Sequence, residues 1–193
     1  MAPDELAPDE LMNEACRLAI ESVRNAWGGP FGAVIARGGE IVAQGQNRVL
    51  LTGDVTAHAE IEAIRKAVQV LNPEAPTIAV EHRNQSTLAM VPAPEGTQDR
   101  FPQRARMLVG MEMYTTGMPC LMCMSAIYWA RLDAAYFASD LAATRSLGFD
   151  DAIQYEDFTK PFTERSVKIE QLRPDLGAAA YAAWSDNPDN HPF

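Results

Sequence analysis

The stretch from residue 31 to residue 43, FGAVIARGGEIVA, sets the predicted fold class. It contains two apolar runs, at 31–36 and 41–43, on either side of the sequence RGGE at 37–40. Short β-forming runs that flank a Gly-Gly pair are typical of a β-hairpin, because glycine adopts the backbone angles that a tight turn needs. We therefore expect two antiparallel strands near the start of the chain.

Helices and further strands follow this hairpin in alternation. Apolar residues recur at three- and four-residue steps in residues 11–26 and 58–71, which is the spacing of an amphipathic helix. The later predicted elements are a strand at 107–114, a turn at 115–119, a helix at 120–129, a strand at 134–138, a helix at 140–147, a candidate strand at 167–172 and a helix at 176–184. This order predicts an α/β fold, an α/β/α three-layer sandwich in which helices cover both faces of a mixed central sheet of about five strands.

The length of 193 residues is that of one domain. We expect residues 1–10 to form a flexible N-terminal tail and residues 11–193 to form the single domain. Within it, residues 73–106 contain five prolines and no regular apolar pattern, so a long inserted loop is predicted there. The arginines of this loop either contact an anion or belong to a solvated surface.

Acidic residues outnumber basic residues, 26 against 16, which gives a net charge of −10. Such a chain repels phosphate backbones, and we expect a small-molecule substrate rather than nucleic acid. No apolar run reaches the roughly 18 residues that a membrane span needs. Three cysteines, an odd number, and an acidic N-terminus unlike a signal peptide predict a cytoplasmic protein with reduced thiols.

Two short motifs open predicted helices and carry metal-binding side chains. The first is His58-Ala59-Glu60, and the second is Pro119-Cys120-Leu121-Met122-Cys123. Two thiolates and one imidazole are three protein ligands, which is how a catalytic zinc ion is held with water in the fourth position. A helix N-terminus also lowers the pKa of a thiol and favours the thiolate. The motifs predict one Zn²⁺ ion per subunit, bound by His58, Cys120 and Cys123.

Glu60 lies two residues after the histidine and is not needed as a ligand. A carboxylate beside a zinc-bound water can take its proton and pass it to a leaving group. The metal lowers the pKa of that water toward ~7, so hydroxide is available at neutral pH. We therefore expect Glu60 to be the proton shuttle of a hydrolytic reaction.

A Cys-x-x-Cys pair alone has other interpretations. It also occurs as a thioredoxin-type redox pair or as half of a structural metal site. Neither alternative uses the His-x-Glu motif at residues 58–60. The combination of the two motifs therefore favours the catalytic zinc site.

A wider set of segments resembles one family. These segments are 28–35 (GGPFGAVI), 45–47 (GQN), 56–60 (TAHAE), 119–123 (PCLMC), 126–131 (AIYWAR) and 148–151 (GFDD). Together they resemble bacterial guanine deaminase of the cytidine/deoxycytidylate deaminase-like zinc deaminase superfamily, whose signature is H-x-E followed by P-C-x-x-C. The resemblance covers most of residues 11–162 apart from the predicted loop, and it implies a cytidine-deaminase-like fold.

The resemblance implies an activity and a role for several residues. The reaction is hydrolysis of guanine to xanthine and ammonia, in which zinc-bound hydroxide attacks the amino-bearing ring carbon. Glu60 acts as the shuttle, and Asp151 assists proton transfer to the leaving amine. The implied substrate contacts are Phe31, which stacks near the base, Asn47, which hydrogen-bonds it, Ala57, Trp129 and Phe193. For Trp129 the sequence leaves packing open as the alternative role.

The resemblance also implies a homodimer. In that family the C-terminal segment can reach into the site of the partner subunit, so the tail at 185–193, with Phe193 at its end, is expected to be exchanged. Two residues depart from the family pattern: Met118 replaces the usual glutamate before the Pro-Cys pair, and Phe193 replaces a polar aromatic residue. Both changes remove polar groups near the expected pocket, which leaves the preferred base open.

Other functions stay open at this point. Cytosine, pterin, triazine or guanosine are alternative rings for the same chemistry. A tRNA adenosine deaminase uses the same zinc core, although it requires a basic strand-binding surface that the net charge of −10 disfavours. A zinc-stabilised binding module without catalysis is the alternative outside enzymes, and it would not need Glu60.

Overall fold

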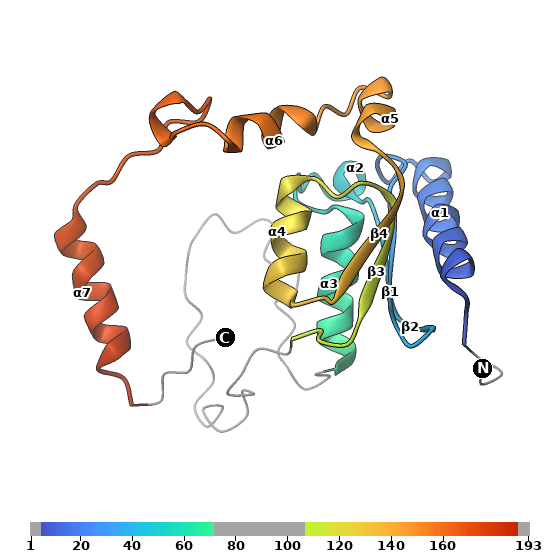
Figure 1. Cartoon of the computed structure of the whole chain (residues 1–193), viewed down its shortest axis with the longest axis horizontal. Coiled ribbons are helices and arrows are strands. Elements are labelled where there is room, and N and C mark those ends of the chain that lie inside the picture. Colours follow the sequence, from blue (N-terminus) through green and yellow to red (C-terminus); the bar gives the residue numbers. More distant parts are fainter. Residues whose placement is uncertain (1–4, 72–106, 189–193) are drawn as a thin grey trace.

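The computed structural model describes residues 5–71 and 107–188. Its sheet has four strands in the order β2-β1-β3-β4 (Figure 1). β1 (Gly32–Arg37) pairs antiparallel with β2 (Glu40–Gln46) and with β3 (Glu112–Gly117), and β3 pairs parallel with β4 (Ala134–Ser139). The sheet is therefore mixed, as the order of elements predicted.

The hairpin is present where the sequence predicted it. Arg37 pairs with Glu40, which leaves Gly38 and Gly39 as the two turn residues, with φ angles of 55° and 84°. These positive angles are those of a type I′ turn, whose twist matches the flanking strands. The hairpin makes β1 an inner strand and β2 an edge strand of the sheet.

Helices cover both faces of the sheet. α1 (Pro8–Arg24) packs on one face, where Leu11 and Leu18 meet Val34 of β1. α3 (Ala59–Leu71) and α4 (Leu121–Ala130) lie on the other face, and Figure 1 shows them side by side. Alternate residues of β1 point to opposite faces, so Val34 packs under α1 while Ile35 belongs to the core under α3 and α4. The predicted α/β/α sandwich is confirmed.

Several predicted boundaries move. α1 begins at Pro8, inside the stretch assigned to the tail, because the Glu10 carboxylate accepts a 2.8 Å hydrogen bond from the Ala7 amide and caps the helix. β3 starts only at Glu112, since Gly110 turns the chain with a φ angle of 76°. β3 then continues through Gly117 into the predicted turn, because these residues pair with β4.

The described residues contain four strands where about five were predicted. The candidate strand at 167–172 is wrong: those residues have no strand structure, and Val167 and Leu172 are 68% and 86% exposed. Their apolar alternation meets no neighbouring strand, and an apolar pattern without a partner does not make a sheet strand. The predicted loop at 73–106 and residues 189–193 lie outside the described residues.

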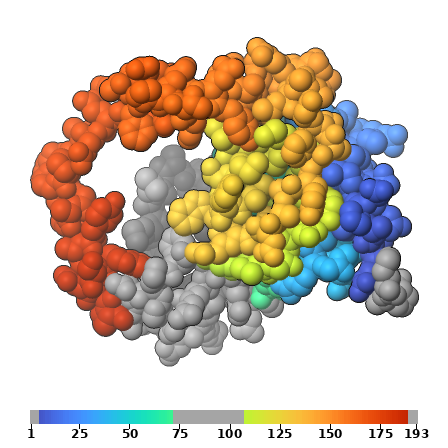
Figure 2. All heavy atoms as spheres, viewed as in Figure 1, coloured from blue at the N-terminus to red at the C-terminus, as the bar shows by residue number. Residues whose placement is uncertain are grey.

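The chain leaves the three layers after α5 (Leu141–Ser146). It continues as α6 (Ala152–Phe158), which the sequence analysis did not predict, the 3₁₀ turn η2 (Phe162–Glu164) and α7 (Pro174–Ser185). Figures 1 and 2 show this stretch, which we call the C-terminal arm (residues 152–188), curving away from the layered core. None of the residues of α7 is buried.

Across residues 5–71 and 107–188, no helix has the length and apolar character needed to cross a membrane.

Candidate active site

Three metal-binding side chains meet at the starts of α3 and α4. His58 precedes α3, Cys120 is the N-cap residue of α4, and Cys123 lies in its first turn. The Nδ1 atom of His58 lies 3.6 Å from Cys120 Sγ and 3.5 Å from Cys123 Sγ, and the three ligand atoms all lie within 4.8 Å of one another. A tetrahedral zinc ion with Zn–S bonds of ~2.3 Å and a Zn–N bond of ~2.0 Å places sulfur and nitrogen about 3.5 Å apart. The side chains therefore fit zinc.

The hydrogen bonds among the three side chains make one of the two thiols a thiolate. Hydrogen bonds with Cys123 and with His58 together lower the pKa of the Cys120 thiol to about 4. The hydrogen bond between the two cysteines and burial raise the pKa of Cys123. The hydrogen bond with Cys120 also raises the pKa of His58. Cys120 is thus a thiolate at neutral pH, as expected at a helix N-terminus.

The backbone around His58 is fixed by Asp54. The Asp54 carboxylate accepts hydrogen bonds from Thr56 N at 2.8 Å and Thr56 Oγ1 at 2.7 Å, and the Thr56 carbonyl accepts one from His58 N. Ala57 is 2% exposed, and its carbonyl accepts a hydrogen bond from Arg48 N. The structure thus places Ala57 in the framework that orients His58, and not on the wall of the cavity described next.

A cavity of about 430 Å³ opens beside the metal ligands. Its lining residues are Gly28, Gly29, Phe31, Asn47, Val49, Leu50, Val55, His58, Glu60, Met118, Cys120, Phe149 and Asp151. The structure therefore brings Phe31, Asn47, Glu60 and Asp151 to one cavity with two of the three metal ligands. Space of this size, with an apolar wall and a few polar groups, suits a small planar ligand.

Two carboxylates face this cavity. Glu60 is 7% exposed in the first turn of α3, and burial raises its pKa. Burial also raises the pKa of Asp151, and the negative charge of Cys120 adds to that rise. A carboxyl group whose pKa is raised toward neutral pH can both accept and donate a proton, which is what general acid–base catalysis requires.

Asn47 presents one end of its amide to the cavity. Its Oδ1 atom accepts hydrogen bonds from Gly29 N at 3.3 Å and Val49 N at 3.2 Å. Because the backbone occupies the oxygen, the Nδ2 group is the end left to donate to a ligand. Gly28 makes this arrangement possible, since a Cβ atom there would overlap the Asn47 side chain.

Two aromatic rings form another wall. The Phe31 and Phe149 rings are 5.1 Å apart with an interplanar angle of 81°, an edge-to-face pair. α5 holds Phe149 in place, because Phe149 N donates to the carbonyl of the buried residue Thr144. Asp150, the next residue, makes a 3.2 Å ion pair with Arg145. These contacts fix the turn that delivers Asp151 to the cavity.

Sequence reasoning missed the apolar rim. Val49 and Leu50 belong to α2 (Val49–Thr52), a helix that the sequence analysis did not predict, and Val55 follows it. Leu50 and Val55 are 72% and 75% exposed. The only local signal was the apolar run VLL at 49–51, which is too short for a periodicity argument.

Besides Ala57, two other predicted substrate contacts are not among the residues that line this cavity. Trp129 is 66% exposed near the end of α4 and does not line the cavity. Phe193 lies outside the described residues.

The comparisons with known proteins agree with this geometry. Residues 7–139 match the family described as the cytidine and deoxycytidylate deaminase zinc-binding region. The match spans more than half of the chain, so the chain belongs to this family of zinc-binding deaminases. It is a zinc-dependent hydrolytic deaminase, and His58, Cys120 and Cys123 are its candidate zinc ligands.

Within that family the similarity to guanine deaminases extends over most of the chain. The chain is 35% identical to guanine deaminase of Bacillus subtilis (strain 168) over 91% of its own length and 92% of that protein. It superposes on the crystal structure of guanine deaminase from Bacillus subtilis with a TM-score of 0.77 and 32% identity, covering 97% of this chain and 99% of the other. Similarity to the tRNA-specific adenosine deaminase of Agrobacterium fabrum is shorter, 32% over 57% of this chain and 51% of that protein.

A solved complex also resembles this fold. The protein NE0047, bound to 2,6-diaminopurine, matches with a TM-score of 0.54 and 25% identity, covering 75% of this chain and 63% of the other. That protein therefore binds an aminated purine.

Proposed function

We propose that the protein converts guanine and water into xanthine and ammonia. The observation that carries the proposal is the cavity that unites two metal ligands, the carboxylates of Glu60 and Asp151 and the amide of Asn47. Similarity to guanine deaminase over 91% of the chain supports guanine as the ring. Zinc, when bound by His58 and the two cysteines, supplies an activated water as the nucleophile.

The carboxylates divide the proton transfers. Glu60 follows His58 on the first turn of α3 and accepts the proton of the attacking water. Asp151 lies in the cavity at the end of the turn after α5, and it assists proton transfer to the leaving amine. Because burial raises the pKa of both groups, each carboxylate accepts a proton more readily than an exposed one and can hold it until it is passed on.

An apolar wall and one hydrogen-bond donor position the planar ring of the substrate. Asn47 offers an N–H donor, so it selects a ring that presents a carbonyl oxygen or an unprotonated ring nitrogen at that place. The Phe31 and Phe149 rings provide an apolar wall for a planar ring. Guanine satisfies both requirements. Met118 adds a thioether to the lining, which makes this wall less polar than a glutamate would.

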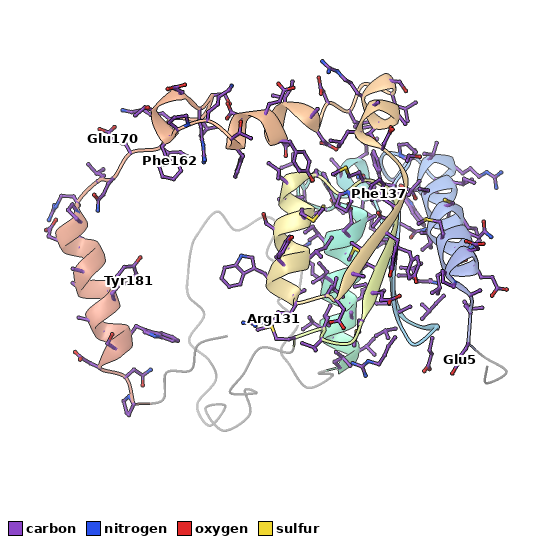
Figure 3. All side chains as sticks on the ribbon, viewed as in Figure 1. Glu5, Arg131, Phe137, Phe162, Glu170 and Tyr181 are labelled. Carbon is purple, nitrogen blue, oxygen red and sulfur yellow. The ribbon has the colours of Figure 1, made fainter. Side chains whose placement is uncertain are left out.

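We also propose a homodimer in which subunits exchange their C-terminal segments. α7 has no buried residue and exposes Leu176, Tyr181 and Trp184. Figure 3 shows Phe162 and Tyr181 on the arm, at a distance from the layered core. Large apolar side chains of this kind are stabilised when another surface covers them. In the exchanged dimer, Phe193 closes the site of the partner subunit and Trp129 gains a contact there.

Cytoplasmic localisation belongs to the same proposal, because a reducing compartment keeps Cys120 and Cys123 as metal-binding thiolates.

A panel of substrates tests the proposed reaction. Zinc-loaded protein is incubated with guanine, guanosine, adenine, cytosine, a pterin, an aminotriazine and a tRNA anticodon stem-loop, and ammonia release is measured. We expect the highest kcat/KM with guanine. A higher kcat/KM with another free ring would replace guanine as the substrate, and deamination of the stem-loop alone would favour the tRNA enzyme. A truncation that ends at residue 173 removes α7 and the tail and tests the exchange: light scattering should report loss of the dimer, and a dimer that persists would contradict the exchange.

A further inference from the structure

A tyrosine of the C-terminal arm is hydrogen-bonded to the turn that carries a zinc ligand. The Tyr155 hydroxyl donates to the Pro119 carbonyl at 2.7 Å, across 36 residues of sequence. Pro119 is fully buried and is followed directly by Cys120. The bond therefore fixes the backbone at the point where the chain turns into α4 and presents its first thiolate.

The same tyrosine shares a helix face with Asp151. Asp151 is the N-cap residue of α6, and Tyr155 follows four residues later, with its backbone N–H 3.5 Å from the Asp151 carbonyl. Residues four apart lie above one another on a helix. The hydroxyl that reaches Pro119 therefore also sets the position of the helix end that places Asp151 in the cavity.

Few other contacts of α6 reach the core. Ile153 and Phe158 are 57% and 60% exposed. Asp157 is buried, but it bonds within the arm, to Lys160 at 3.1 Å and to Ser166 Oγ at 2.9 Å. The apolar contacts of this helix are thus weak, and the Tyr155 hydrogen bond has a large share in holding it to the metal-binding turn.

The hydroxyl is a reliable donor in this place. Burial raises the pKa of Tyr155, and the negative charge of Cys120 adds to that rise. The group therefore stays protonated at neutral pH. Its acceptor is a backbone carbonyl, so the hydrogen bond does not depend on the rotamer of any side chain in the turn.

We propose that Tyr155 is a positioning residue of the metal centre: its hydroxyl holds the turn that carries Cys120 and the helix that carries Asp151 in a fixed relation. The inference rests on the zinc site and the proposed role of Asp151, and not on the identity of the substrate. Groups that do not touch the metal but hold its ligands in place by hydrogen bonds typically contribute about 10–100-fold to metal affinity. Since Tyr155 acts through the backbone, we expect the lower end of that range.

Tyr155→Phe removes only the hydroxyl oxygen, and Tyr128→Phe is the matched control. Tyr128 lies on α4, the helix of Cys123, and is 77% exposed. The dissociation constant for zinc is measured on the full chain by chelator competition, together with the melting temperature of the metal-free protein. The absorption bands of the Co²⁺-substituted protein report the geometry of the ligands.

We expect Tyr155→Phe to weaken zinc binding about tenfold and to shift the Co²⁺ bands, with the metal-free melting temperature within about 2 °C of the wild type. Tyr128→Phe should leave all three unchanged. In turnover, Tyr155→Phe should lower kcat more than it changes KM, because Asp151 is displaced. Unaltered zinc binding in Tyr155→Phe would overturn the proposal, and so would a metal-free protein destabilised as much as the zinc-loaded one. Zinc binding needs no substrate, so this result stands even if guanine proves to be the wrong ring.

Discussion

The Nδ1 atom of His58 lies 3.5 Å from the Sγ atom of Cys123, although 65 residues separate them in the sequence. The contact exists because α3 and α4 lie on the same face of the sheet and both begin at the same end of it. Two helix starts thereby deliver an imidazole and two thiols to one point. The zinc site depends on this convergence.

Removing one sulfur should remove the metal and lower stability together. Cys123→Ala leaves two ligands, and because zinc binds the folded state, its loss subtracts its binding free energy from folding. We expect little bound zinc and a melting temperature lower by roughly 5–10 °C. Elemental analysis and a thermal melt measure both. Cys16→Ala, a half-buried thiol on α1, is the control and should keep its zinc. Full zinc occupancy in Cys123→Ala would show that this sulfur is not a ligand.

Glu60→Gln should separate metal binding from turnover. The amide keeps the size of the buried side chain but cannot carry a proton between water and leaving group. We expect normal zinc content and a kcat lowered roughly 10²–10⁴-fold. Steady-state kinetics and zinc analysis on one preparation decide it. A variant with wild-type kcat would favour a proton carrier other than Glu60, and a protein without turnover in either form would favour the binding module.

Zinc affinity should fall in acid with a defined slope. His58 must lose its proton to bind, and its pKa is raised by the hydrogen bond with Cys120, so the loss begins above the ordinary value of ~6.5. Cys120, with a pKa of about 4, is already ionised over this pH range. The pKa of Cys123 is raised, so Cys123 releases a proton whenever zinc binds.

The affinity should therefore drop about tenfold per pH unit above the pKa of His58 and about a hundredfold per unit below it. Chelator competition between pH 8 and pH 5 measures this. An affinity that does not change over that range would contradict the three-ligand assignment.

Gly28→Ala should disturb substrate binding and spare the metal. The new Cβ atom would overlap the Asn47 side chain, so the Asn47 amide must move and its directed hydrogen bond is lost. We expect KM for guanine to rise about tenfold with normal zinc content. Cys16→Ala, a small change on α1 at a residue that does not line the cavity, is the control. Equal KM values in the two variants would argue against a role for Asn47 in binding.

Periodicity predicted the layers because each layer buries an apolar stripe. Leu11 and Leu18 of α1 mark one such stripe, and the alternation of Val34 and Ile35 in β1 serves the two faces. The zinc ligands were predictable for another reason: His-x-Glu and Cys-x-x-Cys are local patterns whose chemistry is specific. That the two motifs come together could be predicted because each of them begins a helix.

Other features depend on contacts that the sequence does not display. Trp129 carries an aromatic ring suited to stacking, yet its helix position turns it away from the cavity of its own subunit. α6 has seven residues, too few for a visible periodicity. Tyr155 donates its hydrogen bond to the backbone carbonyl of Pro119, beside the zinc ligand Cys120. Every residue has a backbone carbonyl, so the sequence at residue 119 gives no sign of this bond.

Titration of metal-free protein with zinc, while xanthine formation from guanine is followed, tests the central claim most directly. Xanthine production should rise linearly and reach its plateau at one zinc per chain, and Cys120→Ala should stay without activity at the same zinc concentration. Production of xanthine at the same rate without zinc, or none at one equivalent of bound zinc, would contradict the account.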